Sequence, residues 1–442
     1  MTLTTNLEPN QHKDLCEFLL QRPWVKFLYL GWIDFSGVLR VRGITKEYAL
    51  ELTESGKFLQ SSPMAFQCIV DNTLLPDLDL TTSNLYQPDW NSIRNTEPGT
   101  HASASATVMC NVSQVSFRTP EPLRSCPRLA LSRILHAAAE NFGLSFLVGF
   151  EVEFMIMRCS STGDYIPYSS SFGRYSAAGL RDPAFQLVEK CLNELQAAGV
   201  SIQGFHSEGY RGQYEISLGP LPPIQAVDQL VLVHDRIKSV VLSHGYQATF
   251  SPKPNPEWHA NGQHTHISIS PPYHEDHFLA GILKSLRGIC AVTLPYEVSY
   301  RRIKGTEAGT TVAWGSENRA VPVRRVAAGH WEIRCVDALA NMYLALAVIL
   351  SAGILGIQNK EALCWEDATV VPGGSPKSHA SALSLPQSLA EALGSIDKSF
   401  DPISSMVGDG LIERYMRHKK HENSALGAWK PEDVRQLLIQ QF

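Results

Sequence analysis

Clustered cysteines are missing from this chain. Its nine cysteines are scattered, and no two of them form a CxxC pair. A structural zinc site built on cysteine pairs is therefore not expected, and unpaired thiols fit a reducing compartment.

Long hydrophobic runs and basic tracts are missing as well. The most apolar stretch, residues 342–357, is short for a membrane span, so we expect a buried core helix there. The first ten residues show no basic region followed by an apolar core, and no secretory signal is expected. The net charge is -5 without a basic tract, which disfavours nucleic acid as a partner. We expect a cytoplasmic protein that binds neither membranes nor nucleic acid.

The common loop motifs of nucleotide and ester chemistry are absent too. The sequence has no GxxxxGK[ST] loop, no GxGxxG after a strand and no GxSxG turn. Any nucleotide must therefore be held in another way, through metal ions and arginines.

The size and the pattern of the chain point to two domains of mixed structure. At 442 residues, with 44% hydrophobic and 18% charged residues, it is typical of a soluble globular protein. Residues 25–33 and 38–44 predict a hairpin, and a helix is expected over 45–55. We interpret 75–90 as a loop-dominated edge and 101–108 as a mobile stretch. Farther along, an α+β pattern predicts strands over 145–150, 201–205, 213–218, 248–250 and 264–269, and helices over 127–142, 182–198 and 226–244.

Two glutamates two residues apart are the most informative feature. Glu151 and Glu153 follow the apolar segment 145–150, and side chains at i and i+2 of a strand share one face. Two carboxylates held side by side against apolar residues repel each other, and burial strengthens the repulsion. A bound cation, or a proton held between them, would relieve it.

Further polar side chains recur downstream. Glu208 and Glu215 flank a glycine-containing turn across which they can approach each other, although two solvated glutamates would give the same pattern. His264 and His266 alternate in a predicted strand, so both imidazoles point one way. Either both bind a metal, or one binds it while the other contacts a ligand.

Arginines are concentrated between residues 301 and 334, the region that also contains Glu332. Glu332 and Arg334 share a strand face, which alone is typical of a surface ion pair. The cluster contains Arg301, Arg302, Arg319, Arg324, Arg325 and Arg334. Guanidinium groups bind carboxylates and phosphates through paired hydrogen bonds, so the cluster suggests an anionic substrate; the alternative is a solvated basic face. Five glutamates with a histidine suit Mg²⁺ or Mn²⁺ rather than zinc.

Taken in order, these residues form motifs that resemble the glutamine synthetase family over almost the whole chain. The motifs are GFEVEF (149–154), HSEGYRGQYEI (206–216), ATFSPKP (248–254) with NGQHTHIS (261–268), SYRR (299–302), WGSENR (314–319) with Arg324, and EIR (332–334). The resemblance is closer to the γ-glutamyl-amine ligase-like branch than to housekeeping glutamine synthetase. It implies an α+β fold with a small β-grasp-like domain over 1–115, and a large catalytic domain over 116–442 with a curved antiparallel sheet flanked by helices.

The resemblance also implies roles for single residues. Glu153, Glu208 and Glu215 would bind one divalent cation, and Glu151, His264 and Glu332 would bind a second. The amino-acid substrate would contact Gly262, His264, Arg302 and Arg334; the nucleotide would contact His266, Ser268, Arg319 and Arg324; and catalysis would use Glu307, Arg302 and Arg319. The spacing from Arg302 to Trp314 is one residue shorter than usual, which leaves the choice between Arg301 and Arg302 open.

The implied reaction has two steps. A carboxylate, expected to be the γ-carboxylate of glutamate, attacks the γ-phosphorus of ATP to give an acyl phosphate, and an amine then displaces phosphate to give an amide. Two or more Mg²⁺ or Mn²⁺ ions and several arginines would neutralise the anions. Glu307 would take the proton that the amine loses.

The N-terminal part departs from the family pattern. Glutamine synthetases carry an Asp-Gly-Ser-Ser element whose aspartate helps to bind ammonium, but the matching stretch here, GKFLQSS over 56–62, has no aspartate. We therefore expect an amine larger than ammonia. Two alternatives stay open: a glutamine synthetase that uses ammonia, and a non-catalytic structural or regulatory member of the family. The resemblance also implies a double-ring homo-oligomer, a decamer or dodecamer, in which residues 60–62 complete the site of a neighbouring chain.

Overall fold

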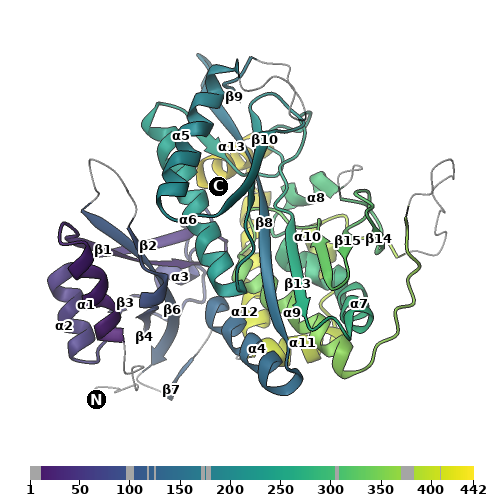
Figure 1. The fold of residues 1–442 in the computed structure, drawn as a ribbon, viewed down its shortest axis with the longest axis horizontal. Helices are drawn as coiled ribbons and strands as arrows, with labels where there is room; N and C mark the ends of the chain where they lie inside the picture. The colour runs from purple at the N-terminus through teal and green to yellow at the C-terminus, as the bar shows by residue number, and fades with distance from the viewer. Residues whose placement is uncertain are drawn as a thin grey trace.

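The computed structural model describes residues 11–95, 104–116, 119–123, 126–170, 175, 181–303, 308–369, 383–408 and 410–442. These residues form two β-sheets with helices packed against them, a smaller unit at the N-terminal end and a larger one that holds the rest of the chain (Figure 1). The α+β class expected from the sequence is confirmed.

The smaller sheet is built on the predicted hairpin. β1 (Phe27–Ile33) and β2 (Leu39–Thr45) pair antiparallel around a turn at Gly37, whose φ is +88°. A Cβ on Gly37 would lie 2.2 Å from the carbonyl oxygen of Leu339. The turn therefore needs glycine both for its left-handed backbone and for its close contact with the larger unit. α1 (Gln11–Gln21) and α2 (Lys46–Glu54) pack together beside this sheet (Figure 1).

Two expectations for this region are wrong. The segment 75–90 contains the strand β4 (Thr82–Pro88), and residues 105–108 begin the long strand β6 (Ser105–Ser116). β6 pairs with β1 on one side and with β4 on the other, so it lies inside the sheet. Polar or small residues make up most of both strands and give little hydrophobic periodicity, which hides the strands in the sequence. Within the described residues the strand order is β2-β1-β6-β4-β3, with β5 and β7 also paired to β6.

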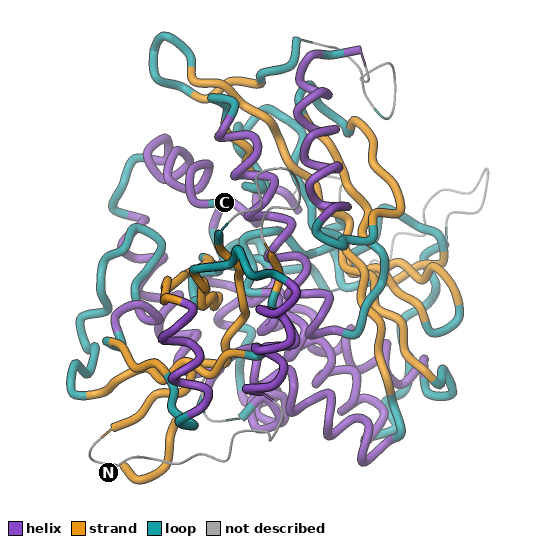
Figure 2. Tube along the Cα trace, turned by 60° about the vertical axis from the view of Figure 1, so that its left-hand side comes forward, coloured by secondary structure: helices purple, strands orange, loops and turns teal. Residues whose placement is uncertain are grey.

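The larger sheet is centred on β8 (Ser145–Cys159). Within the described residues its order is β10-β11-β8-β13-β16-β15-β14, with β9 and β12 also paired to β8. The pairs of β8 with β11 and β13 are antiparallel, and so is the pair of β13 with β16. The sheet is strongly curved (Figure 2), so side chains on its inner face approach one another from several strands.

A helical core supports this sheet. α4 (Pro127–Phe142), α7 (Glu275–Thr293) and α9 (Met342–Gln358) pack together in the larger unit (Figure 1). α9 is buried along nearly its whole length, as predicted for residues 342–357. Among the described residues, no helix has both the length and the apolar character that a membrane crossing requires.

The remaining elements complete the two units. The strands are β3 (Leu59–Ser61), β5 (Arg94–Asn95), β7 (Thr119–Leu123), β9 (Tyr165–Pro167), β10 (Ile202–Ser207), β11 (Gln213–Leu218), β12 (Gln247–Thr249), β13 (Thr265–Ser270), β14 (Trp314–Ser316), β15 (Val323–Ala327) and β16 (His330–Ile333). The helices are α3 (Met64–Gln67), η1 (Trp90–Ser92), α5 (Pro183–Ala197), α6 (Pro223–Ser243), α8 (Glu297–Ile303), α10 (Leu389–Gly394), η3 (Lys398–Phe400), α11 (Asp401–Val407), α12 (Leu411–Gly427) and α13 (Pro431–Gln441).

Candidate active site

One row of polar side chains crosses three neighbouring strands. His206 on β10 stands opposite Glu215 on β11, and Glu215 stands opposite Glu153 on β8. Residues that face each other across antiparallel strands project to the same side of the sheet. Glu208 follows directly after β10, and one ligand atom each of His206, Glu208 and Glu215 lie within 4.8 Å of one another. The sheet register therefore brings together the acidic residues that the sequence predicted for the first cation.

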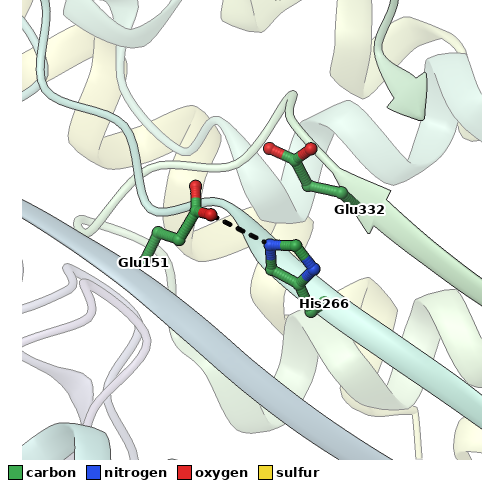
Figure 3. A group of neighbouring side chains, drawn as sticks. All are labelled: Glu151, His266 and Glu332. Carbon is green, nitrogen blue, oxygen red and sulfur yellow. Dashed lines mark hydrogen bonds and ion pairs between the residues drawn. The ribbon is translucent and has the colours of Figure 1, made fainter. Parts of the chain in front are cut away.

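A second row lies on the other side of β8. His266 on β13 stands opposite Glu332 on β16, and Glu332 stands opposite Arg324 on β15. Glu151 reaches this row from β8, and one ligand atom each of Glu151, His266 and Glu332 lie within 4.8 Å of one another (Figure 3). Figure 3 shows these three side chains converging from three strands, with His266 Nε2 3.2 Å from Glu151 Oε1.

His264 lies between the two groups. Its Nδ1 is 2.9 Å from Glu151 Oε2, 3.3 Å from Glu332 Oε1 and 3.8 Å from Glu153 Oε1. Both His264 and His266 therefore contact Glu151, and both alternatives raised by the His-x-His pattern fit the geometry. The six residues expected to bind cations lie together on one face of the larger sheet.

The two groups differ in charge balance. Burial, followed by the charge of Glu153, raises the pKa of Glu208 to about 7. Burial raises the pKa of Glu215 to about 9, and the charges of Glu151, Glu153 and Glu208 add to the effect. The first group thus holds more negative charge than its surroundings compensate, which is the condition that a divalent cation relieves.

The second group is compensated by cationic and imidazole neighbours. Burial would raise the pKa of Glu151, but hydrogen bonds from His264 and His266 outweigh it and lower that pKa. Burial would likewise raise the pKa of Glu332, but His264 and Arg334 lower it. Arg334 Nη1 lies 2.5 Å from Glu332 Oε1, and Arg324 forms a second ion pair with the same carboxylate.

Arg302, rather than Arg301, reaches the site. Arg302 is 2% exposed and donates to the backbone carbonyls of Arg334 and Val336, at 2.9 and 3.2 Å. Its Nη2 is also 3.1 Å from His264 Nε2. Arg301, the preceding residue on α8, is exposed and lines a different cavity, away from the two rows.

Gly262 lies against Glu153, His264 and Arg302. Its backbone N–H donates to Glu153 Oε2 at 2.8 Å. A Cβ on Gly262 would lie 2.6 Å from Arg302 Nη2, 2.9 Å from Glu153 Oε1 and 3.0 Å from His264 Nε2. No side chain fits there without moving the residues around it.

Two cavities open from these rows. A cavity of about 590 Å³ is lined by Glu151, Glu153, Tyr175, His206, Glu208, Gln213, Glu215, His259, His264, Arg302, Arg319 and Arg334, among others. A second cavity of about 520 Å³ is lined by Leu147, Glu151, Gln203, Ser217, His266, Ser268 and His330, among others. Glu151 lines both. Two ligands placed in these cavities would meet at the paired groups of carboxylates and imidazoles.

Sequence reasoning left some lining residues without a role. His206 carried none, although it stands two residues before Glu208 in a motif that was recognised. His330, whose Nε2 lies 3.1 Å from His266 Nδ1, was given no role either. Glu307, the expected base, lies outside the described residues.

The donor set fits divalent cations. Carboxylate oxygens with imidazole nitrogens are ligands of Mg²⁺ and Mn²⁺, and the acidic surplus of the first group favours their binding. The lining of the first cavity supplies Arg302, Arg319 and Arg334 for anionic substrates.

Comparisons with known proteins agree with this architecture. The protein fluG of Emericella nidulans is 32% identical over 443 residues, which cover 97% of this chain but 50% of fluG, so the chain spans half the length of that relative. The γ-glutamylpolyamine synthetase GlnA3 of Streptomyces coelicolor is 31% identical over 377 residues, 76% of each protein. A solved structure of a GmaS/ADP complex superposes with a TM-score of 0.79 at 23% identity, covering 96% of this chain and 98% of GmaS, and supports the fold.

A family model gives the assignment. The model for the glutamine synthetase catalytic domain matches residues 124–434 and includes every described residue of the two rows. The chain belongs to the glutamine synthetase family of ligases.

Proposed function

We propose that this protein is an ATP-dependent ligase that forms an amide between the γ-carboxylate of glutamate and an amine. One observation carries the proposal: Glu151, a member of the second group, lines both large cavities, and the residues of the first group line one of them. That arrangement suits a reaction in which two anions, a carboxylate and a nucleotide triphosphate, must be brought together.

The chemistry explains why so many charges are needed. A carboxylate oxygen attacks the γ-phosphorus of ATP, the bond to ADP breaks, and an acyl phosphate forms. The amine nitrogen then attacks the acyl carbon, phosphate leaves, and a base takes the surplus proton. When bound, two Mg²⁺ or Mn²⁺ ions would neutralise the phosphates and hold the reactants in place. Glu153, Glu208 and Glu215 would hold one ion; Glu151 and Glu332, with His264 or His266, would hold the other.

Arginine, histidine, serine and glycine residues of the chain would orient the substrates. Arg302 and Arg334 line the first cavity and suit the carboxylate of the amino acid. Gly262, which has no side chain to crowd Arg302 and Glu153, is proposed to contact the same substrate. His266 and Ser268 line the second cavity, which we propose for the nucleotide. Arg319, which lines the first cavity, and Arg324, which pairs with Glu332, would face its phosphates. We propose Glu307 as the base that takes the proton of the amine.

The acceptor is proposed to be an amine rather than ammonia. The stretch 56–62, which includes β3, carries no aspartate where ammonium-using relatives have one. GlnA3, a relative at 31% identity, is named for polyamine substrates. Ammonia stays the second candidate and belongs in every acceptor panel.

Assembly and location complete the proposal. We propose a cytoplasmic double-ring oligomer in which residues 60–62 of one chain border the cavity of its neighbour, and domains over 1–115 and 116–442. Gln60 is exposed on β3, as such a role requires. Light scattering tests the assembly, because an active monomer would contradict it.

Turnover tests the proposal directly. The protein is incubated with ATP, Mg²⁺, glutamate and a panel of ammonia, monoamines, diamines and polyamines, and phosphate release and new amides are measured. We expect amide formation with at least one amine and its loss in Glu153→Gln. Glu189→Gln, a change at an exposed glutamate on α5, is the matched control and should keep full activity. The proposed ligase activity would be overturned if none of the acceptors in the panel led to phosphate release. Undiminished turnover in Glu153→Gln would overturn it as well.

A further inference from the structure

His206 belongs to the first row by the same geometry as the acidic residues. It is the direct antiparallel neighbour of Glu215, and its Nδ1 lies 3.9 Å from Glu215 Oε1. Its ligand atom lies within 4.8 Å of those of Glu208 and Glu215. The proposed reaction has given His206 no task so far.

These spacings are those of atoms that share one ion. Ligands of an octahedral ion at 2.0–2.1 Å stand roughly 3 Å apart when adjacent and roughly 4 Å apart when opposite. The 3.9 Å between His206 Nδ1 and Glu215 Oε1 is too long for a hydrogen bond, but it falls within this range. The pair is therefore poorly explained as a simple hydrogen bond and well explained as two ligands around a common centre.

The position of His206 is fixed by the sheet and open to the cavity. Its backbone is held in β10 by the register with β11, and its side chain is 32% exposed where it lines the 590 Å³ cavity. An ion that enters through this cavity meets an imidazole that can turn toward it without breaking the backbone pairing of β10 with β11. Both rows then share one composition, since each contains glutamates and at least one histidine.

We infer that His206 binds the first divalent cation directly through a ring nitrogen and gives this site a preference for Mn²⁺ over Mg²⁺. The inference rests on the proposed function, which places a cation between Glu153, Glu208 and Glu215. Mg²⁺ favours an all-oxygen shell with several waters, whereas imidazole nitrogen suits the softer transition-metal ions. One nitrogen among carboxylate oxygens therefore shifts the selectivity of the site without changing its charge.

Mn²⁺ is the probe because it reports on its ligands without any turnover. The full chain is loaded with Mn²⁺, and electron spin-echo spectra measure couplings to ¹⁴N, while competition with Mg²⁺ gives the ratio of the two affinities. The same measurements are made on His206→Gln, which offers an amide of similar size, and on His259→Gln. His259 lines the same cavity but stands outside both groups of possible ligands, which makes it the matched control.

In His206→Gln we expect one class of ¹⁴N coupling to disappear and the Mn²⁺-to-Mg²⁺ affinity ratio to fall roughly tenfold, the effect of a single donor atom. The couplings from His264 or His266 at the second ion should remain, and His259→Gln should match the wild type. Circular dichroism confirms that each variant is folded.

Three results would overturn the inference. If His206→Gln keeps every coupling and the same affinity ratio while binding Mn²⁺, His206 is not a ligand, and the proposed ligase stands. If His259→Gln shows the same losses, the effect does not come from one ligand, and the inference fails again. If the folded wild type binds no Mn²⁺ at all, the inference and the proposed function fail together.

Discussion

Replacing Glu215 by glutamine should stabilise the metal-free protein and weaken its stabilisation by metal. Glu215 is 7% exposed and stands in the middle of the first row, between His206 and Glu153. Burial and three neighbouring glutamates raise its pKa from 4.5 to about 9. Glutamine keeps the shape of the side chain and removes the charge.

The magnitude follows from that pKa. At pH 7.5 the carboxyl group is ionised in the unfolded chain and protonated in the metal-free folded protein, a difference of three pH units from 4.5. At ~1.4 kcal/mol per unit, protonating Glu215 on folding costs at most about 4 kcal/mol of folding free energy. A glutamine side chain carries no such cost because it has no charge to neutralise. We expect a net gain of about 2 kcal/mol, because the glutamine amide must still find hydrogen-bond partners in a buried site.

Thermal unfolding with and without Mg²⁺ is the assay. The wild type should gain stability with Mg²⁺ according to the saturation of its sites, about 2.7 kcal/mol at a hundredfold excess over Kd. Glu215→Gln should melt higher than the wild type in EDTA and gain much less from Mg²⁺.

Glu332→Gln is the matched control, because its surroundings lower the pKa of the carboxylate, whereas those of Glu215 raise it. Glu332 is fully buried, and it pairs with Arg324 and Arg334. Its loss removes the carboxylate charge that two buried guanidinium groups share and should cost about 3 kcal/mol in EDTA. The reasoning is refuted if Glu215→Gln lowers the metal-free melting temperature, or if it keeps the full response to Mg²⁺.

Three further predictions test other parts of the site. Gly262→Ala places a methyl group 2.6 Å from Arg302 Nη2 and 2.9 Å from Glu153 Oε1. We expect turnover, measured by steady-state kinetics, to fall by roughly 100-fold, while circular dichroism shows that the fold survives. A loss of turnover smaller than twofold would contradict the crowding. In EDTA, the stability of the folded protein should decline as pH rises from about 5 to 9, because the raised pKa values of Glu208 and Glu215 mean that the folded state keeps their protons to higher pH than the unfolded chain does. The gain in stability from Mg²⁺ should be largest at high pH. A melting temperature that rises over this pH range in EDTA would refute the prediction. Arg302→Lys breaks the bonds to the carbonyls of Arg334 and Val336 and should raise KM for the carboxylate substrate by about tenfold or more, whereas Arg301→Lys on the same helix should leave it unchanged; equal effects of the two would contradict the assignment.

The sequence predicted the content of the site better than its internal arrangement. Glu151 and Glu153 share a face because a strand alternates, and this follows from two letters of sequence. The contact of His206 with Glu215 depends on the register of β10 against β11, which the turn between them sets through Gly212 at φ +71°. No single segment carries that information.

The charge balance of the site was also beyond the sequence. Glu332 and Arg334 looked like a surface ion pair, yet Glu332 is fully buried and its carboxylate holds two arginines from neighbouring strand positions. The strands β4 and β6 were missed for a related reason. Their burial comes from neighbours in the sheet, and their own polar and small residues give no periodic signal.

The central claim is that the two rows each hold a divalent cation. Crystals of the protein soaked in Mn²⁺ and measured at the manganese absorption edge test it most directly. The account predicts two anomalous peaks per chain, one among Glu153, Glu208 and Glu215 and one between Glu151 and Glu332. Saturating Mn²⁺ without a peak at either place, in crystals whose side chains are ordered, would contradict it.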